Sequence, residues 1–243
     1  MNNKFKALLL AAGYGTRLKP HTINKPKCLV DIGGIPLLEY WLKNLEESSC
    51  QEVLINTHYL SEQVEAFLEK RPNSQMIIKT SFEKKLLGTA GTLKQNINFF
   101  KEDLGVLIHA DNFTLLDLKK FVKAHKQRNK KTLLTMVTFL TETPGSCGIV
   151  ETDNDKILIE FTEKPLNPKS FMANAAIYAF EKKFIQEFIK LENPYDFSKD
   201  VIVKFKGKIQ TWFTDETLID IGTPESLKKA QDLAFKQNKK ENT

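Results

Sequence analysis

The stretch at residues 6–30, KALLLAAGYGTRLKPHTINKPKCLV, carries the strongest signal for the fold, because a short apolar run leads directly into a cationic, glycine-rich loop. The run at 7–10 predicts a buried first strand. Gly13 and Gly15 permit a tight turn that presents backbone N–H groups, and Arg17 offers a fork of donors that suits phosphate oxygens. A strand followed by such a loop predicts a phosphate-binding edge of an α/β sheet.

The rest of this loop supplies a second cation. Pro20 and Pro26 stiffen the chain and hold Lys27 near the glycines, whereas Lys25 is interpreted as a surface charge. Arg17 and Lys27 can then bind two parts of one anion. The segment lacks both the Walker pattern G-x-x-x-x-G-K-[ST] and the third glycine of a dinucleotide fingerprint. A polyphosphate ligand is therefore favoured over hydride chemistry.

The first half of the chain alternates short apolar runs with amphipathic stretches, which is the βαβ pattern of a mostly parallel sheet. We expect strands at 7–10, 53–56, 75–80 and 105–109, and helices at 36–48, 61–70, 89–98 and 115–128. Strands at 132–140, 146–151, 156–161 and 173–180 have fewer helices between them and predict a mixed sheet in the second half, with a small β lobe inserted on the same core. Helices at 181–191, 197–206 and 224–237 and a strand at 209–213 complete the pattern.

Composition limits the class of protein. With 243 residues, 41% of them hydrophobic, the chain can form one core, so we expect a single α/β domain at 1–236 and a flexible basic tail at 237–243. The net charge of +6 comes partly from that tail, and no basic stripe alternates with aromatic residues, so we expect no nucleic-acid partner.

Cellular location is also predicted from the sequence. Three cysteines in no ligand-like pattern favour a reducing cytoplasm. No secretory signal is apparent, and no apolar run approaches the roughly 18 residues of a membrane span. We expect a cytoplasmic protein without a membrane partner. The sequence leaves the oligomeric state open, a homo-oligomer included.

Motifs along nearly the whole chain resemble those of the sugar-1-phosphate nucleotidylyltransferases. The resemblance begins with AAGYGTRLKPHTINKPKCLVDIGGIPLLEYWL at 11–42 and continues in order through LLGTAG (86–91), HAD (109–111), EKP (163–165), NAAIY (174–178) and DIGTPE (220–225). It implies a Rossmann-like, GT-A-like sheet. It also implies a reaction in which a nucleoside triphosphate and a sugar 1-phosphate give a nucleotide-sugar and pyrophosphate by in-line attack at the α-phosphorus.

The resemblance also implies roles for the charged residues. Arg17 would hold the β- and γ-phosphates, Lys27 would reach the α-phosphate and the attacking phosphate, and Lys164 would bind the incoming phosphate from the opposite wall. Asp111 and Asp220 each end an apolar strand, so their carboxylates would emerge at one rim of the sheet and bind Mg²⁺.

Contacts with the nucleotide are expected from the first loop and the LLGTAG region: Leu10, Ala11, Ala12, Gly13, Gly15, Thr16, Arg17, Lys27, Glu83, Gly88, Thr89 and Asp111. Thr89 is also a candidate helix cap. Glu83 would read the base, because a carboxylate only accepts hydrogen bonds and guanine offers adjacent N1–H and N2–H₂ donors. This reasoning favours GTP.

Contacts with the acceptor are expected from a second group of residues: Asn112, Gly148, Glu163, Lys164 and Asn174. The sequence departs from the family at NAAIY, where Ala175 and Ala176 stand in place of the common Ala-Gly pair. The lost glycine weakens the argument for a sugar at this point.

Several activities remain open. Mannose- and heptose-1-phosphate guanylyltransferases are compact relatives of the expected kind. The alternatives are a cytidylyltransferase for phosphocholine or another non-sugar phosphate, a uridylyltransferase for a hexose or muramic acid 1-phosphate, and an inactive nucleotide-binding regulatory subunit. Because the printed chain ends shortly after DIGTPE, we expect no acetyltransferase β-helix.

Overall fold

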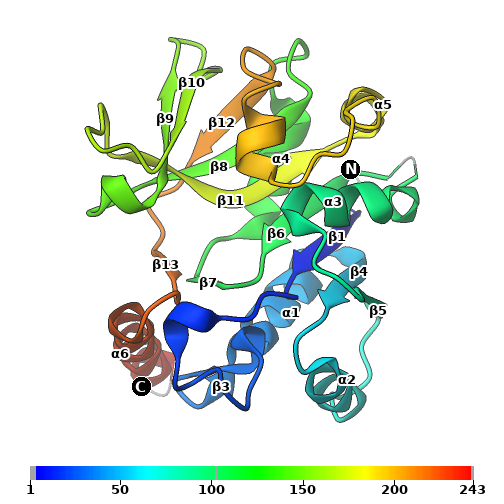
Figure 1. Cartoon of the computed structure of the whole chain (residues 1–243), viewed down its shortest axis with the longest axis vertical. Helices are drawn as coiled ribbons and strands as arrows, with labels where there is room; N and C mark the ends of the chain where they lie inside the picture. Colours follow the sequence, from blue (N-terminus) through cyan, green and yellow to red (C-terminus); the bar gives the residue numbers. More distant parts are fainter. Residues whose placement is uncertain (1–3, 102, 242–243) are drawn as a thin grey trace.

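The structure is a computed structural model that describes residues 4–101 and 103–241 (Figure 1). Within those residues one sheet has nine strands: β1 (Phe5–Leu10), β4 (Cys50–Thr57), β5 (Ile77–Phe82), β6 (Gly105–His109), β8 (Leu134–Leu140), β9 (Gly148–Thr152), β10 (Leu158–Glu163), β11 (Met172–Phe180) and β12 (Ile209–Phe213). The strand order is β10-β9-β11-β6-β1-β4-β5, and β8 joins β11 to β12.

The sheet is mixed, as the sequence predicts. Strands β5, β4, β1 and β6 are parallel neighbours, whereas β11 runs antiparallel to β6, β8 and β9. Strands β9 and β10 form an antiparallel hairpin at one edge. The strands of the expected β lobe extend the main sheet, in agreement with a lobe inserted on the same core.

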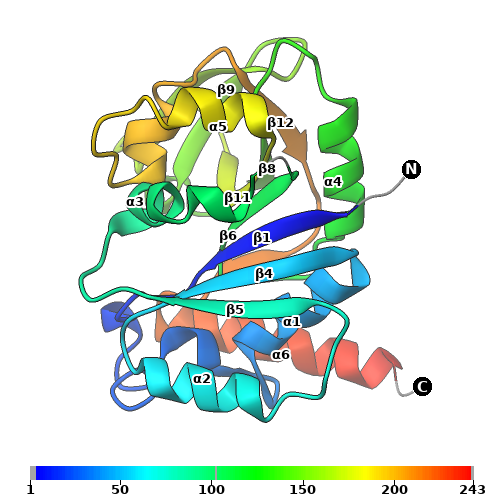
Figure 2. The same cartoon turned by 90° about the vertical axis from the view of Figure 1, so that its right-hand side faces the viewer.

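Helices cover both faces of the sheet (Figure 2). Phe5, Ala7 and Leu9 of β1 belong to the core under α1 (Leu37–Glu47), α2 (Ser61–Glu69), α4 (Leu118–Gln127) and α6 (Pro224–Glu241). Leu8 points to the opposite core, which lies under α3 (Gly88–Gln95), α5 (Lys182–Phe188) and the π-helical η5 (Phe197–Ile202). Burial on both faces explains why residues 7–10 of this strand are all apolar.

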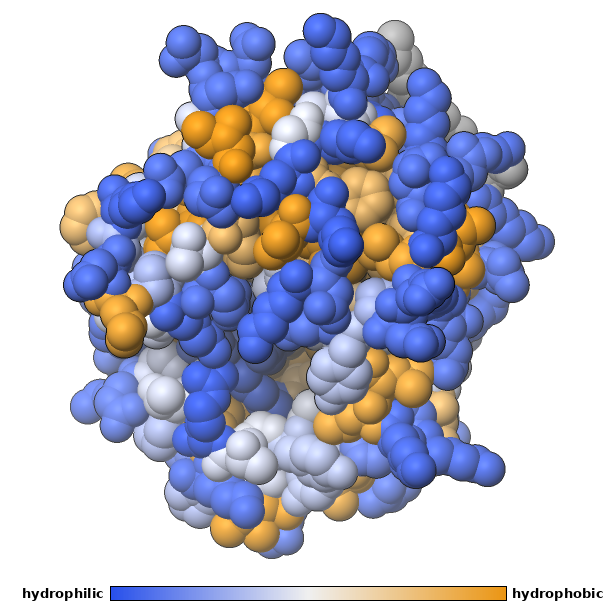
Figure 3. All heavy atoms as spheres, turned by 45° about the horizontal axis from the view of Figure 1, so that its top comes forward, coloured by the Kyte–Doolittle hydropathy of each residue, from blue (hydrophilic) through white to orange (hydrophobic). Residues whose placement is uncertain are grey.

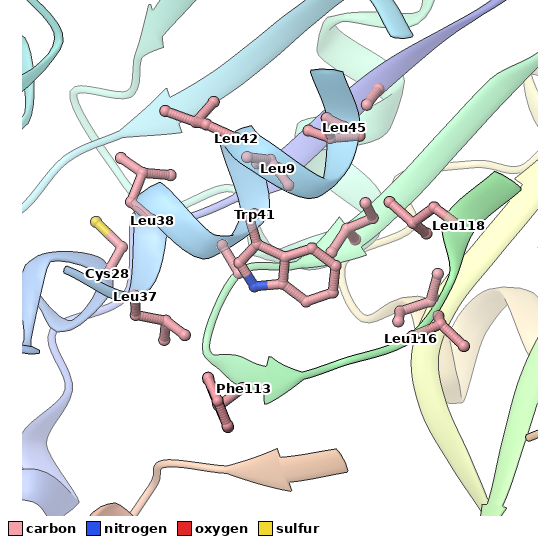
Figure 4. Close-up of a cluster of buried hydrophobic side chains, with 14 of the residues drawn as sticks. Leu9, Cys28, Leu37, Leu38, Trp41, Leu42, Leu45, Phe113, Leu116 and Leu118 are labelled. Carbon is pink, nitrogen blue, oxygen red and sulfur yellow. The ribbon is translucent and has the colours of Figure 1, made fainter. Parts of the chain in front are cut away.

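The apolar face of α1 anchors the segment that follows β6. Trp41 and its helical neighbours are buried against Phe113, Leu116 and Leu118 (Figure 4). The Trp41 indole N–H donates a hydrogen bond to the backbone oxygen of Asn112 at 2.9 Å. This contact fixes the chain immediately beyond Asp111.

A short two-stranded ribbon precedes α4, and that helix begins later than the sequence predicts. Strand β7 (Asn112–Thr114) pairs antiparallel with β13 (Leu218–Asp220), so α4 begins at Leu118 rather than 115. The Asp117 carboxylate caps this helix by accepting a hydrogen bond from the backbone N–H of Lys120 at 3.0 Å. The predicted helix start was wrong because residues 112–114 pair with a strand that lies far along the chain.

The C-terminal segment differs from our expectation as well. Helix α6 continues to Glu241, so most of the basic tail expected at 237–243 is helical, and residues 242–243 lie outside the described part. Hydrophilic residues cover most of the face in Figure 3, with hydrophobic residues in separate patches. Among the described residues, no helix has the length and apolarity needed to cross a bilayer.

Candidate active site

Four parallel strands deliver their carboxyl ends to one cavity of about 220 Å³. The chain places β4 and β5 on one side of β1 and then returns to place β6 on the other side. Ligands of open α/β sheets bind at such a reversal. The lining residues are Leu10, Ala11, Ala12, Gly13, Lys27, Cys28, Asn56, Glu83, Leu86, Gly88, Thr89, Thr92, His109, Ala110, Asp111 and Tyr195.

Most of the predicted nucleotide contacts therefore line this cavity, but Gly15, Thr16 and Arg17 lie outside it. Gly15 adopts φ +62°, and a Cβ there would lie 2.9 Å from Thr22 Cγ2, so the turn requires glycine. Thr16 and Arg17 follow in a short 3₁₀ helix. The guanidinium of Arg17 is exposed and lies 3.6 Å from an oxygen of Asp220.

Lys27 joins the two predicted metal ligands. Its Nζ lies 2.8 Å from Asp111 Oδ2 and 3.1 Å from Asp220 Oδ1. The lysine side chain is only 10% exposed, whereas those of Asp111 and Asp220 are 39% and 49% exposed. A buried ammonium thus lies between two carboxylates that remain open to a ligand.

The β7–β13 ribbon explains why two distant aspartates meet. Asp220 lies opposite Asn112 in the ribbon, and the Ile221 N–H donates a hydrogen bond to the Asp111 carbonyl at 3.1 Å. Asp111 follows β6, as predicted. Asp220 ends a strand of the ribbon rather than a strand of the large sheet, which corrects the expected placement and still brings the carboxylates together.

The charges of Lys27, Asp111 and Asp220 strongly affect one another's protonation. Burial would lower the pKa of Lys27, but the carboxylates of Asp111 and Asp220 outweigh it and raise that pKa above its usual value. Burial would raise the pKa of Asp111, but the Lys27 ammonium holds it below its usual value. Lys27 is therefore cationic and Asp111 anionic at neutral pH.

The donor set fits a divalent cation. Oxygens from Asp111 and Asp220 already converge on one cationic atom, and carboxylate oxygens are ligands that Mg²⁺ prefers. Among the described residues, no group of three or more His, Cys, Asp or Glu side chains could bind a metal. A Mg²⁺ ion at this pair would take its other ligands from phosphate oxygens and water, as is common for this ion.

Glu83 lines the cavity, and internal hydrogen bonds hold its carboxylate. It is 2% exposed, and its carboxylate accepts hydrogen bonds from Asn56 Nδ2 at 2.9 Å, Thr92 Oγ1 at 2.5 Å and the Leu87 N–H at 3.1 Å. Oε1 takes two of these donors and Oε2 takes one, so Oε2 can still accept a further hydrogen bond. Glu83 thus holds the loop at 83–88 against β4, and its contact with guanine stays a prediction.

Two predicted roles are corrected. Asn112 is 6% exposed, and its amide donates a hydrogen bond to the Ala175 carbonyl at 3.1 Å, so it is a structural link rather than a sugar contact. Thr89 is no helix cap, because α3 starts at Gly88 and the Thr89 hydroxyl accepts a hydrogen bond from the Phe197 N–H at 2.7 Å.

Three of the remaining acceptor candidates lie on β9, β10 and β11, and Lys164 directly follows β10. Glu163 is opposite Gly148, where a Cβ would lie 2.5 Å from Phe161 Cζ, so packing requires the glycine. Burial raises the pKa of Glu163. Lys164 is exposed, and Asn174 donates a hydrogen bond to the Tyr178 hydroxyl at 2.7 Å. None of these four candidates lines the cavity.

Ala176 occupies a strained backbone position. Its φ is +55°, at an irregularity in the pairing of β11 between Asn174 and Tyr178. Glycine adopts this conformation without the steric cost that a Cβ imposes. The departure from the family at NAAIY thus falls on the one residue of the motif that has a positive φ.

We expect Ala176→Gly to stabilise the protein by about 1 kcal/mol, or roughly 3 °C in melting temperature, because it relieves this strain. Differential scanning calorimetry measures the change. Ala175→Gly is the matched control. Ala175 is 1% exposed and has no positive φ, so removing its buried Cβ should lower the melting temperature. A lower melting temperature for Ala176→Gly would contradict the strain.

Sequence reasoning missed Asn56 and Tyr195. Asn56 Oδ1 accepts a hydrogen bond from the Ala11 N–H at 2.7 Å, which ties the first loop to β4. Its position at the carboxyl end of a predicted strand was an available signal. Tyr195 comes from a segment without a recognised motif.

Cys28 also lines the cavity, but burial raises the pKa of its thiol to about 12, so it is no nucleophile at neutral pH.

Comparisons with known proteins agree with this geometry. UTP–glucose-1-phosphate uridylyltransferase of Synechocystis sp. is 32% identical over 212 residues, which cover 82% of this chain and 54% of that protein. D-glycero-alpha-D-manno-heptose 1-phosphate guanylyltransferase of Campylobacter jejuni is 30% identical over 221 residues, which cover 90% of this chain and 96% of that protein. The chain spans about half the length, 54%, of two of its curated relatives.

A solved structure and a family model extend the agreement. The crystal structure of HddC from Yersinia pseudotuberculosis complexed with GMP-PN matches with a TM-score of 0.79 and 26% identity, covering 94% of this chain and 98% of that one. The family model described as nucleotidyl transferase matches residues 6–237. Because this match takes in the first loop, both aspartates and nearly the whole sheet, the chain belongs to the nucleotidyl transferase family.

Proposed function

We propose that the protein joins a nucleoside triphosphate, with GTP favoured, to a sugar 1-phosphate of the mannose or heptose type, releasing pyrophosphate. The observation that carries the proposal is the convergence of Lys27, Asp111 and Asp220 at the cavity beside the glycine loop. Both substrates are soluble anions, in keeping with a cytoplasmic enzyme.

The chemistry requires positioning and charge neutralisation more than covalent help. A phosphate monoester is mostly dianionic at neutral pH, so the acceptor oxygen attacks the α-phosphorus without a general base. Lys27, held at the cavity by two carboxylates, lies where it can neutralise the α-phosphate. Arg17, exposed at the outer side of Asp220, can hold the departing pyrophosphate.

Asp111 and Asp220 would hold Mg²⁺. When bound, that ion supplies charge neutralisation for the transferring phosphoryl group. The acceptor would be held by Glu163, Lys164 and Asn174 on the β9–β11 side, with Lys164 neutralising the incoming phosphate. An inactive regulatory subunit could lose the two cations of the first loop or the two aspartates, but all of these groups are present, which favours an active enzyme.

Comparison supports the preference for GTP beside the argument from Glu83. The heptose relative is named as a guanylyltransferase, and the solved structure holds GMP-PN. A uridylyltransferase is the second candidate, because the relative from Synechocystis has that name.

A panel of nucleoside triphosphates against mannose, heptose, glucose, N-acetylhexosamine and choline phosphates tests the proposal by pyrophosphate release. We expect release only with Mg²⁺ and both substrates, and the highest rate with GTP and a mannose- or heptose-type phosphate. Release with UTP and a hexose phosphate would support the second candidate. Release with CTP and phosphocholine alone, or no release at all, would contradict a sugar-phosphate substrate.

A further inference from the structure

One wall of the cavity comes from the second half of the chain. Tyr195, which lies between α5 and η5, lines the cavity together with Leu86, Gly88 and Thr89. Tyr195 is 59% exposed, a large fraction for an aromatic residue that lines a cavity. Neither the sequence motifs nor the mechanism above gives this ring a role.

Hydrogen bonds fix the backbone on both sides of the ring. The Tyr195 carbonyl accepts from the Ala90 N–H at 3.0 Å, and the Tyr195 N–H donates to Asp200 Oδ2 at 2.8 Å. Two residues further, the Phe197 N–H donates to the Thr89 hydroxyl at 2.7 Å. These contacts hold Tyr195 against the start of α3.

Gly88 allows the ring to approach this closely. A Cβ on Gly88 would lie 2.3 Å from the Tyr195 carbonyl oxygen and 2.8 Å from the ring atoms Cγ and Cδ2. Gly88 also has φ +74°, a conformation that favours glycine. The ring therefore rests on the glycine backbone, where any other residue would displace it.

The residues that line the cavity with the ring indicate its ligand. Lys27 and Asp111 supply charged groups that suit phosphate, whereas Leu86, Gly88 and Tyr195 carry no ionisable carboxylate or ammonium. An exposed, fixed aromatic ring suits the flat face of a heterocycle, and such stacking tolerates any base because each has a π face.

We propose that Tyr195 binds the nucleobase of the triphosphate by stacking, an inference that rests on the proposed function. A stacked ring supplies affinity for the base without reading its hydrogen-bonding edge. Tyr195 thus contributes to nucleotide binding and little to the choice between guanine and uracil.

Calorimetric titration with GTP, UTP and inorganic tripolyphosphate tests this role. Tyr195→Ala should weaken binding of both nucleotides by about tenfold or more, the size of one lost base–aromatic stack, and leave the affinity for tripolyphosphate unchanged. Tyr195→Phe should bind like the wild type. Phe235→Ala is the matched control, because Phe235 is 57% exposed on α6 and does not line the cavity.

The outcomes separate this inference from the proposed function. Equal losses for GTP and tripolyphosphate, or unchanged nucleotide affinity in Tyr195→Ala, would overturn the stacking role. A higher KM for the sugar phosphate with unchanged nucleotide affinity would assign the ring to the acceptor instead and also overturn it. If the wild-type protein binds nucleotides but releases no pyrophosphate, the proposed reaction fails while the stacking role stands on the titrations.

Discussion

Asp111→Asn should lower the rate of pyrophosphate release on the order of 10³-fold, the usual effect of removing a group that stabilises charge at a transferring phosphoryl group. The substitution keeps the shape of the side chain and removes its charge. It removes a proposed ligand of Mg²⁺ and one of the two carboxylates that hold Lys27. Steady-state rates over a series of Mg²⁺ concentrations measure both effects.

The same variant should stay folded, because the Asp111 side chain is 39% exposed and an amide is uncharged. A melting temperature close to that of the wild type separates lost chemistry from lost structure. Asp31→Asn is the matched control: Asp31 pairs with Lys25 at 2.7 Å on the surface, and exposed pairs of this kind contribute little. A rate within a few fold of the wild type in Asp111→Asn would remove this residue from the site.

Lys27→Met should have two effects. Turnover should fall on the order of 10³-fold, because a cation at the α-phosphate is lost. Without Mg²⁺ the protein should also lose about 2 kcal/mol of stability, since Asp111 and Asp220 would face each other without the shared ammonium. The proposed Mg²⁺ site lies between these two carboxylates, so the ion should restore stability more strongly in this variant than in the wild type.

Thermal unfolding with and without Mg²⁺ measures the second effect without reference to activity. Lys25→Met is the matched control, because Lys25 forms a surface pair with Asp31. It should show wild-type turnover and a wild-type response to Mg²⁺. An identical response to Mg²⁺ in Lys27→Met and the wild type would contradict a cation site between the two aspartates.

The sequence predicted the parts of this site that depend on local pattern. The unbroken apolar run before Gly13 reflects burial on both faces of β1, and the glycine at 15 reflects a positive φ, so both signals lie within a few residues. Asp111 was predictable because it directly follows a buried strand. Lys27 was found through the prolines that hold its loop.

The rest depended on contacts between distant segments. Glu83 was expected to read the base, yet Asn56 and Thr92 donate to its carboxylate, and no local pattern shows those donors. Asn112 was expected in the sugar site, but the ribbon with β13 and the Ala175 carbonyl hold it in the interior. Tyr195 lines the cavity, and its carbonyl accepts a hydrogen bond from the Ala90 N–H of α3, roughly a hundred residues earlier in the chain.

The central claim, in-line attack at the α-phosphorus, is tested most directly by following the α- and γ-phosphorus of GTP into the products. GTP labelled either at the α-phosphorus or at the γ-phosphorus is incubated with the protein, Mg²⁺ and mannose or heptose 1-phosphate, and the products are separated. In-line attack at the α-phosphorus predicts that the α label appears in a nucleotide-sugar and the γ label in an equal amount of pyrophosphate. The γ label in orthophosphate or on the sugar, with the α label left in a nucleoside diphosphate, would contradict the account.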